Sequence, residues 1–269
     1  MKSNPEFIRF LAAGKEHIGF VQGGSLYSLS YSSMLECIED DFEFPGKKEA
    51  DSTKIKILPP IIPSKIICLG WNYKAHIKEL KAKDTNTILF LKPSSAVVGH
   101  TQNIIYPSFS KQVEHEVELG VVIKKTGKNI RRDNAENYVA GYTIVLDMTA
   151  RDLQWASRDK GDPWDIAKGF DTSAPIGPGI IPKRYISDPH NLEMTLWVNG
   201  KLRQHSNTSD MLHKIPEIIE YVSTYFTLNA GDIIATGTPE GVGPVKVGDE
   251  IKAEIEGIGQ LKNKIVKEK

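Results

Sequence analysis

The sequence predicts a strand-rich α+β protein, with a small β-rich unit at its N-terminus followed by a larger mixed unit. Two observations support this fold class. Short alternating apolar runs separated by glycine turns occupy residues 6–31, as in an antiparallel meander. Further along, β-branched apolar runs of strand length recur between loops, while helical patterns are found at residues 73–81, 149–158 and 211–226.

The N-terminal unit is predicted to end near residue 60. An acidic and then basic stretch over residues 39–51 leads into the proline-rich residues 58–63. Clustered charge and proline are typical of a linker or of the beginning of a new domain. We therefore divide the chain into a small β-rich domain, residues 1–60, and a larger domain, residues 61–269.

Composition narrows the function classes. The chain has 269 residues, of which 40% are apolar and 25% charged, and its formal net charge is zero. A core of useful size is therefore available, and a nucleic acid partner is not indicated. The sequence has neither an export signal nor an apolar run long enough for a membrane span, so we expect a cytoplasmic protein. Cys37 and Cys68 lack the spacing of a zinc site and are expected to be free thiols.

The segment from Glu114 to Ile123 combines acidic side chains with a β-branched apolar run and predicts one continuous strand. Side chains alternate along a strand, so Glu116 and Glu118 share a face, about 7 Å apart. Two unit charges at 4 Å cost roughly 4 kcal/mol at an effective dielectric of 20, so converging carboxylates favour a bound divalent cation. The alternative is a solvated sheet face on which the two carboxylates do not meet.

A histidine and a glutamate are paired on the first predicted helix of the larger domain. Asn72 is expected to cap this helix, which covers residues 73–81. His76 and Glu79 are three positions apart and share a helical face, as a general base and the carboxylate that orients it require. Alternatively, the pair arises by chance on an exposed lysine-rich helix, with Glu79 bonded to Lys83.

A third acidic residue, Asp147, lies between a strand and a helix. It ends the apolar run at residues 138–147, and the Thr-x-x-Asp sequence at residues 149–152 predicts a helix cap directly after it. Arg151 and Gln154 lie one turn further on, so all three side chains can face one pocket. The Arg151 guanidinium suits a substrate carboxylate, although a structural Arg151 to Asp147 salt bridge is an equal alternative.

Two later segments could contact an anion. Lys168 lies among apolar residues, where a partly desolvated ammonium could face an anionic ligand. Residues 231–244 begin as a strand and become a glycine-rich turn, which lacks the lysine of a phosphate loop and does not imply ATP. Thr236 and Thr238 could hold a small anion there, or the segment is simply a tight turn.

Three other segments predict structure without a site. Residues 99–107 read as a loop. Asn199-Gly200 is a strong type I′ turn signal between two strands. Residues 211–226 carry an apolar stripe at helical spacing, which predicts a helix packed on the core.

Together these motifs resemble the fumarylacetoacetate hydrolase family, most strongly its acylpyruvase and oxaloacetate decarboxylase branch. The resemblance covers roughly residues 60–266 and rests on five motifs in the same order. They are Asn-Tyr-x-x-His-x-x-Glu at 72–79, Glu-Val-Glu-Leu at 116–119, Leu-Asp-Met-Thr-Ala-Arg-Asp-Leu-Gln at 146–154, Lys168, and Thr-Gly-Thr-Pro-x-Gly-Val-Gly at 236–243.

The resemblance implies a mixed β-sandwich roll with flanking helices, a homodimer, and a bound Mg²⁺ or Mn²⁺. The residues that match the family's functional positions are Glu116, Glu118 and Asp147 for the metal, His76 and Glu79 for water activation, and Arg151, Gln154, Lys168 and Thr238 around the substrate. Two positions depart from the family pattern. His115 stands where an aromatic residue is common, and Trp155 stands where a polar residue is common. By alternation His115 points away from Glu116, so it is not expected to be a ligand.

The function that follows is divalent-metal-dependent cleavage of a C–C bond in a small 2-oxo acid. Such an acid chelates a hard cation, so acylpyruvate hydrolysis or oxaloacetate decarboxylation could proceed through a metal-stabilised pyruvate enolate. His76 would serve the hydrolytic reaction, while Lys168 would neutralise the substrate carboxylate or assist protonation. One alternative is an isomerase of the 2-hydroxyhepta-2,4-diene-1,7-dioate type. A more distant one is a non-catalytic protein that binds a metal or ligand.

Overall fold

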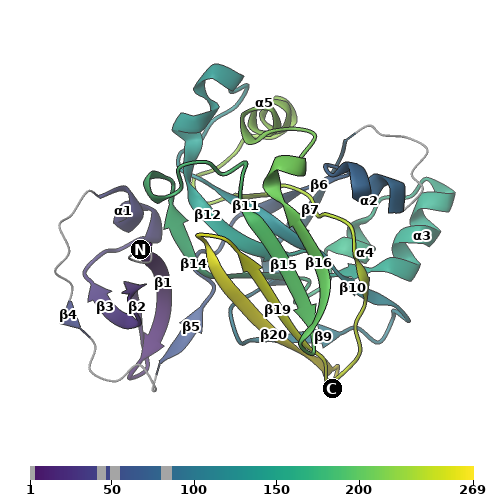
Figure 1. The fold of residues 1–269 in the computed structure, drawn as a ribbon, viewed down its shortest axis with the longest axis horizontal. Helices are drawn as coiled ribbons and strands as arrows, with labels where there is room; N and C mark the ends of the chain where they lie inside the picture. Colours follow the sequence, from purple (N-terminus) through teal and green to yellow (C-terminus); the bar gives the residue numbers. More distant parts are fainter. Residues whose placement is uncertain (1–3, 41–46, 49–54, 80–86) are drawn as a thin grey trace.

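The computed structural model describes residues 4–40, 47–48, 55–79 and 87–269 (Figure 1). Within these residues the largest sheet has twelve strands. They are β1 (Glu6–Ala12), β2 (Lys15–Gln22), β3 (Ser25–Leu29), β4 (Lys47–Lys48), β5 (Lys56–Leu58), β6 (Lys65–Gly70), β7 (Ile88–Pro93), β8 (Val97–Val98), β11 (Val117–Ile123), β12 (Val139–Leu146), β14 (Ala174–Pro182) and β17 (Ile233–Ala235). Their order is β4-β3-β2-β1-β14-β12-β11-β17-β6-β7, with β5 beside β1 and β8 beside β14.

Two smaller sheets complete the β structure. The five-stranded sheet has the order β16-β15-β19-β20-β9, and the three-stranded sheet has the order β13-β10-β18. Their bounds are β9 (Asn103–Tyr106), β10 (Val113–His115), β13 (Thr149–Ala150), β15 (Glu193–Val198), β16 (Lys201–Asn207), β18 (Gly243–Pro244), β19 (Glu250–Ile255) and β20 (Gly259–Lys267). β9 corrects the expectation of a loop over residues 99–107, because it pairs in parallel with β20.

The core of the larger unit lies between the five-stranded sheet and the centre of the large sheet. Leu119 and Ile144 of the large sheet belong to the same buried cluster as Leu196, Ala253 and Leu261 of the smaller one. Figure 1 shows β15, β16, β19 and β20 lying across β11, β12 and β14. Alternation of buried and exposed residues along β15 and β19 leaves their other face toward solvent. The predicted strand-rich α+β fold is therefore confirmed, as a mixed β-sandwich.

Strands β1, β2 and β3, over residues 6–29, form the predicted antiparallel meander. β1 pairs with β2, and β2 pairs with β3. The meander also extends the large sheet, because Phe7 of β1 is paired with Ile180 of β14. The division near residue 60 stays a prediction, and most of the charged stretch over residues 39–51 lies outside the described residues.

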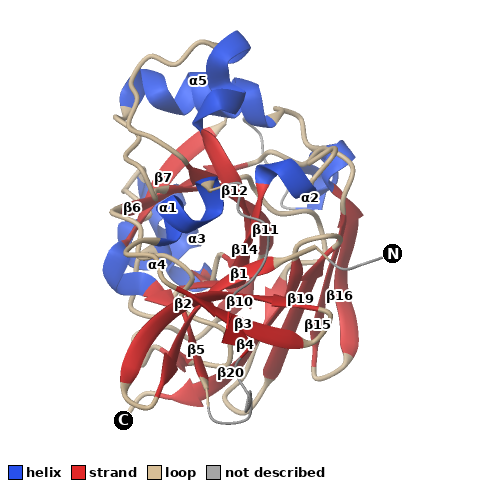
Figure 2. Ribbon diagram, turned by 90° about the vertical axis from the view of Figure 1, so that its left-hand side faces the viewer, coloured by secondary structure: helices blue, strands red, loops and turns tan. Residues whose placement is uncertain are grey.

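Five α-helices flank these sheets in the described part of the chain (Figure 2). They are α1 (Met34–Glu39), α2 (Lys74–Glu79), α3 (Arg151–Lys160), α4 (Asp165–Lys168) and α5 (Ile215–Tyr225). None of them combines the length and the apolar character needed to cross a bilayer. The predicted stripe of α5 is buried at Ile215, Ile218, Ile219 and Val222, although the helix begins four residues later than expected.

Two predicted helix caps are wrong. Ala150 occupies the N-cap of α3 and makes no side-chain cap bond. Asp152 instead accepts hydrogen bonds from the hydroxyl of Ser110 and the N–H of Lys111, because the chain before β10 passes the start of the helix. Asn72 donates its amide to the carbonyls of His213 and Thr236 and accepts from the N–H of His213. It therefore ties α2 to two distant loops.

Other local predictions are confirmed. Asn199 and Gly200 have φ values of 51° and 73°, as the type I′ turn between β15 and β16 requires. Cys37 and Cys68 are buried free thiols.

The prediction of one continuous strand over residues 114–123 is wrong. The strand is interrupted at Glu116, so that β10 and β11 belong to different sheets. This break matters for the site described below.

Glu6 leads to a prediction about stability. Its side chain packs over Gly179 and Gly259, and its Oε1 atom is buried without a hydrogen bond among the described residues. Burial raises the pKa of Glu6 to about 7, against a hydrogen bond from the N–H of Gly179. Between about pH 4.5 and 7 the Glu6 carboxyl group is therefore protonated in the native state and ionised in the unfolded state. The free energy of unfolding should fall by up to about 3 kcal/mol as the pH rises across that window.

Replacing Glu6 with Gln should remove this fall, so the variant should be more stable than the parent at pH 8 and similar to it at pH 4.5. Urea unfolding at the two pH values measures the difference. Glu193→Gln, an exposed change of the same kind, serves as the control. An unchanged pH dependence in the Glu6 variant would show that this carboxyl group is ionised in the native protein.

Candidate active site

A small cavity lies where the ends of the central strands meet α2, α3 and α4. β6, β7, β11 and the segments that follow β6, β12 and β17 supply one part of its wall, and the three helices with the residue before α4 supply the rest. Its lining residues are Leu69, Gly70, Trp71, His76, Phe90, Glu116, Glu118, Asp147, Arg151, Gln154, Trp164, Lys168 and Thr238. Eight of the nine residues predicted from the sequence to form the site line this cavity. The ninth, Glu79, lies beside it, hydrogen-bonded to His76.

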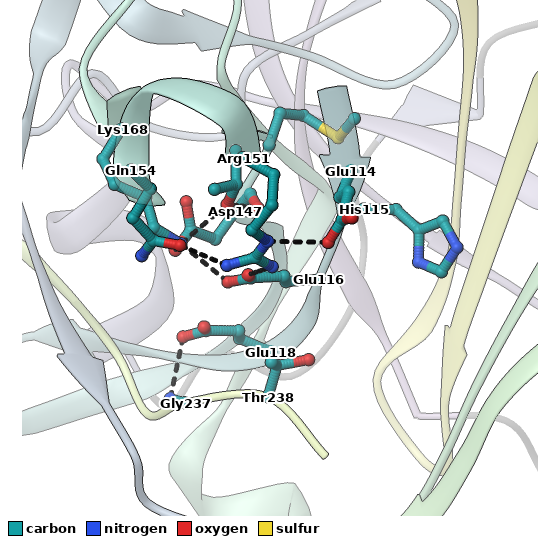
Figure 3. Close-up of polar contacts among 12 residues, drawn as sticks. Glu114, His115, Glu116, Glu118, Asp147, Arg151, Gln154, Lys168, Gly237 and Thr238 are labelled. Carbon is teal, nitrogen blue, oxygen red and sulfur yellow. Dashed lines mark hydrogen bonds and ion pairs between the residues drawn. The ribbon is translucent and has the colours of Figure 1, made fainter. Parts of the chain in front are cut away.

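Three carboxylates converge on this cavity (Figure 3). Each of Glu116, Glu118 and Asp147 is buried, and each offers an oxygen within 4.8 Å of the others. Strand pairing brings them together, since Val117 of β11 is paired with Leu146 of β12 and the N–H of Asp147 donates to the carbonyl of Glu116 at 2.9 Å. The solvated-face alternative for Glu116 and Glu118 is therefore wrong.

The two glutamates have opposite electrostatic environments. Burial together with the neighbouring Asp147 and Glu116 carboxylates raises the pKa of Glu118 well above its ordinary value, against a hydrogen bond from the N–H of Gly237 at 2.8 Å. Burial also disfavours ionised Glu116, but Lys168 and Arg151 outweigh it and lower the pKa of Glu116. Glu118 is thus the carboxylate whose negative charge is least compensated by the protein.

Two buried lysines face Asp147. Lys168, at the end of α4, donates to Asp147 Oδ2 at 2.6 Å, Glu116 Oε2 at 2.8 Å and Thr149 Oγ1 at 2.7 Å. Burial alone would lower the pKa of Lys168, but Asp147 and Glu116 raise it. Lys92, on β7, lies 2.8 Å from Asp147 Oδ1, while its hydrogen bonds go to Ser173 and to the carbonyls of Met148 and Lys168.

The donor set fits a hard divalent cation. Oδ1 of Asp147 is buried and accepts no hydrogen bond from the described residues, although the Lys92 ammonium is near. Around the cavity, four buried carboxyl groups (Glu114, Glu116, Glu118 and Asp147) face three buried cations (Lys92, Arg151 and Lys168). One negative charge is left over, and carboxylate oxygens are the ligands that Mg²⁺ and Mn²⁺ prefer. Glu116, Glu118 and Asp147 could therefore hold such an ion.

Arg151, the first residue of α3, is held in place by two carboxylates and an amide. Its Nε donates to Glu114 Oε2 at 2.7 Å, and its terminal nitrogens donate to Glu116 and to Gln154. The alternative of an Arg151 to Asp147 salt bridge is thus wrong, because Asp147 is paired with lysines. Glu114 lies on β10, and Glu116 lies between β10 and β11, so two carboxylates that are two residues apart both accept hydrogen bonds from Arg151.

The predicted histidine and glutamate pair is formed. His76 Nδ1 lies 3.1 Å from Glu79 Oε2, and His76 is buried. Glu79 Oε1 accepts the N–H of Gly241 at 3.0 Å, which joins α2 to the glycine-rich turn after β17. Burial raises the pKa of Glu79, but these hydrogen bonds lower it below its ordinary value. Lys83, the alternative partner, lies outside the described residues.

Thr238 and His115 both contact Gln204 of β16. Thr238 Oγ1 accepts from Gln204 Nε2 at 2.8 Å and donates to the carbonyl of Val117 at 2.9 Å. His115 Nδ1 lies 3.1 Å from Gln204 Oε1, and its ring points away from the carboxylates (Figure 3). Burial lowers the pKa of His115, which favours a neutral imidazole. His115 is therefore a packing residue, as alternation predicts.

Three residues at the site, Lys92, Glu114 and Gln204, were not predicted from the sequence to belong to it. Lys92 carries a signal, since it is a charged residue near the end of an otherwise apolar strand. Glu114 also carries one, because it is two residues before Glu116. Gln204 carries none, because its position opposite β11 depends on how the two sheets pack.

Comparisons with known proteins agree with this geometry. Residues 65–266 match the family model described as fumarylacetoacetate (FAA) hydrolase C-terminal. The mitochondrial oxaloacetate tautomerase FAHD1 of Mus musculus is 47% identical over 201 residues, which cover 74% of this chain and 90% of that protein.

Solved structures resemble most or nearly all of the chain. A 2-hydroxyhepta-2,4-diene-1,7-dioate isomerase from Mycobacterium marinum is 33% identical, with a TM-score of 0.84 and coverage of 99% of both chains. A fumarylpyruvate hydrolase from Pseudomonas aeruginosa, solved in complex with Mn²⁺ and pyruvate, is 35% identical. Its TM-score is 0.73, with coverage of 85% of this chain and 100% of that one.

Because the charge of the Glu118 carboxylate is the least compensated, we predict how its replacement changes stabilisation by a metal ion. Mn²⁺ at 100 times its dissociation constant should add about 2.7 kcal/mol to the free energy of unfolding, because the ion binds the native state alone. Glu118→Gln should abolish most of this gain. With EDTA the same variant should be at least as stable as the parent, since it no longer buries the extra negative charge. Thermal unfolding with Mn²⁺ or EDTA measures both effects.

Glu250→Gln, a change on the exposed face of β19, controls for loss of a carboxylate elsewhere. It should keep the full Mn²⁺ effect. A Glu118 variant that is stabilised by Mn²⁺ as strongly as the parent would rule out this carboxylate as a ligand.

Proposed function

This chain belongs to the fumarylacetoacetate hydrolase family, and from that premise we propose that it is a divalent-metal-dependent enzyme that cleaves a C–C bond in a small 2-oxo acid. An acylpyruvate is the proposed substrate class. The observation that carries the proposal is the placement of a buried group of three carboxylates and a histidine and glutamate pair on the same cavity.

The carboxylates and the histidine have different proposed roles in the reaction. Bound to Glu116, Glu118 and Asp147, Mg²⁺ or Mn²⁺ would supply Lewis-acid polarisation of the substrate's keto oxygen. His76 supplies a base: its Nδ1 is held by Glu79, which leaves Nε2 to accept a proton. The hydrogen bond from Gly241 to Glu79 fixes the carboxylate that orients the ring.

In the proposed hydrolysis, His76 removes a proton from water as the water oxygen bonds to the distal carbonyl carbon. The bond between C3 and C4 of the 2,4-dioxo acid then breaks, and its electron pair stays on the pyruvate half, which takes up a proton at C3. The products are pyruvate and the free acid of the acyl group. The atoms balance with water as the one co-reactant.

The remaining residues are proposed to hold the substrate. Arg151 presents its guanidinium to the cavity, and Gln154 fixes its orientation. Lys168 donates its three hydrogen bonds to Glu116, Asp147 and Thr149. Its proposed contact with a substrate carboxylate would therefore require it to exchange one of these partners. The Thr238 hydroxyl is bonded to Gln204 and to the carbonyl of Val117, and its proposed role is to shape the wall.

A second candidate function is favoured by a specific observation. The Mus musculus relative, 47% identical over 201 residues, is named an oxaloacetate tautomerase. Tautomerisation or decarboxylation of oxaloacetate needs the same polarised keto group but no attacking water, so the same cavity could serve it with less demand on His76. The diene-dioate isomerase reaction named for the Mycobacterium marinum structure is a further alternative.

A homodimer and a cytoplasmic location are also part of our proposal.

Steady-state assays distinguish these reactions. Acetylpyruvate, fumarylpyruvate, oxaloacetate and 2-hydroxyhepta-2,4-diene-1,7-dioate should be compared with Mg²⁺, with Mn²⁺ and with EDTA. We expect the acylpyruvates to be cleaved with either metal and all turnover to stop with EDTA. Turnover that survives complete chelation would contradict the proposed site.

Replacing His76 with Ala should lower the rate of acylpyruvate hydrolysis by about 10²- to 10⁴-fold, because the general base is lost. Any oxaloacetate decarboxylation or tautomerisation should fall much less. Glu79→Gln should show the same pattern more weakly, since it keeps the hydrogen bond but not the charge. Rates with both substrates measure the split, and His205→Ala, on exposed β16, is the control. Equal losses with both substrates would contradict the assignment of His76 to water activation.

A further inference from the structure

One face of α3 continues from the cavity toward its rim. Arg151 and Gln154 line the cavity, and Arg158 lies seven residues beyond Arg151, which returns to nearly the same helical face. Trp155 lies on that side too, four residues after Arg151. This half of the helix is therefore positioned to meet the end of a ligand that extends out of the cavity.

Arg158 is held between two indole rings. Its guanidinium carbon lies 5.2 Å from the centre of the Trp155 ring and 5.9 Å from that of Trp71. Trp71 itself lines the cavity, and its ring stands edge-on to that of Trp164, another lining residue, at 6.3 Å. Arg158 thus contacts a residue that lines the cavity. We call Trp71, Trp155 and Trp164 the aromatic rim.

The charge of Arg158 is not compensated by the described residues. Each of the other arginines and lysines at the cavity, Lys92, Arg151 and Lys168, is paired with a carboxylate. Arg158 makes two cation–π contacts and no ion pair within the described part of the chain. Cation–π contact with indole rings positions a guanidinium while leaving N–H donors available for a carboxylate.

We propose that Arg158, supported by Trp71 and Trp155, binds the distal carboxylate of the substrate and so selects dicarboxylic 2-oxo acids over monocarboxylic ones. This inference rests on the proposed function, because it places the 2-oxo acid end of the ligand at the three carboxylates and Arg151. It also gives Trp155 a role, at a position where the sequence departs from the pattern of the family it resembles.

Length further defines the ligand. Seven residues of α-helix separate Arg151 and Arg158 by about 10 Å along the axis. Six C–C bonds in an extended chain span roughly 7 Å, from single-bond lengths of about 1.5 Å, so the carboxylates of a seven-carbon acid can contact both guanidinium groups. Four-carbon oxaloacetate spans roughly half of that distance and can contact one of them at a time. The geometry therefore favours a long dicarboxylic acylpyruvate such as fumarylpyruvate.

A matched pair of ligands tests the proposal without turnover. 2-Oxoheptanedioate and 2-oxoheptanoate have the same length and the same 2-oxo acid end, but the second lacks the distal carboxylate, and neither has the 4-oxo group that hydrolysis requires. Titration of the Mg²⁺-loaded protein, followed by tryptophan fluorescence, gives both dissociation constants, since Trp71, Trp155 and Trp164 surround the rim.

The parent protein should bind the dicarboxylate roughly 10- to 100-fold more tightly than the monocarboxylate, the range expected for a charged hydrogen bond. Arg158→Gln should remove this preference by weakening the dicarboxylate alone. Lys160→Gln loses the same charge from the same helical turn, at an exposed position, and should keep the preference. With fumarylpyruvate as substrate, Arg158→Gln should raise KM more than it lowers kcat.

The other outcomes overturn different parts of the argument. Equal affinity of the parent for the two ligands, or an equal loss of both in Arg158→Gln, overturns the Arg158 subsite and leaves the proposed 2-oxo acid chemistry intact. If the parent binds neither ligand and cleaves no acylpyruvate, the proposed function fails and the subsite with it.

Discussion

The confinement of four carboxyl groups near one buried point is the constraint on which the rest of this structure depends. Glu116, Glu118 and Asp147 could not share a volume of this size as free anions, because desolvation and mutual repulsion both oppose their ionisation. The protein compensates with Lys92, Lys168 and Arg151, each held by further hydrogen bonds. The compensation is unequal, and Glu118 is the carboxylate beside which a cation would be most stabilising.

This constraint explains several features of the backbone. The strand is interrupted at Glu116, where Glu114 and Glu116 both accept hydrogen bonds from Arg151, while Glu118 lies on the paired strand β11. The turn after β17 brings the N–H of Gly237 to Glu118. Gly237 has a φ of 95°, and a Cβ there would lie 2.9 Å from Cβ of Asn72. Glycine is required there because residues with a Cβ rarely adopt this φ and because the added Cβ would lie too close to Asn72.

Much of the site could be predicted because its chemistry is encoded locally. Alternation places Glu116 and Glu118 on one face, and helical spacing joins His76 to Glu79. The caps could not be predicted in this way, because Asn72 and Asp152 bond to segments 40 or more residues distant in sequence. The same limit applies to Gln204, whose contacts with His115 and Thr238 depend on the packing of the five-stranded sheet. Local pattern thus predicts the groups that we propose to react, whereas the residues that support them required tertiary structure.

On the proposed function, one part of the cavity would stabilise charge and another part would recognise the substrate. Hydrolysis, decarboxylation and tautomerisation of a 2-oxo acid all develop negative charge beside the keto group, and the buried carboxylates with their cation would serve each of them equally. Differences between such reactions must therefore come from outside that group. In the proposed function the available positions are His76 with Glu79, which would decide whether water is activated, and the aromatic rim around Arg158, which would decide what lies beyond the keto acid. A change of reaction or substrate could then occur at either position without disturbing the buried charges.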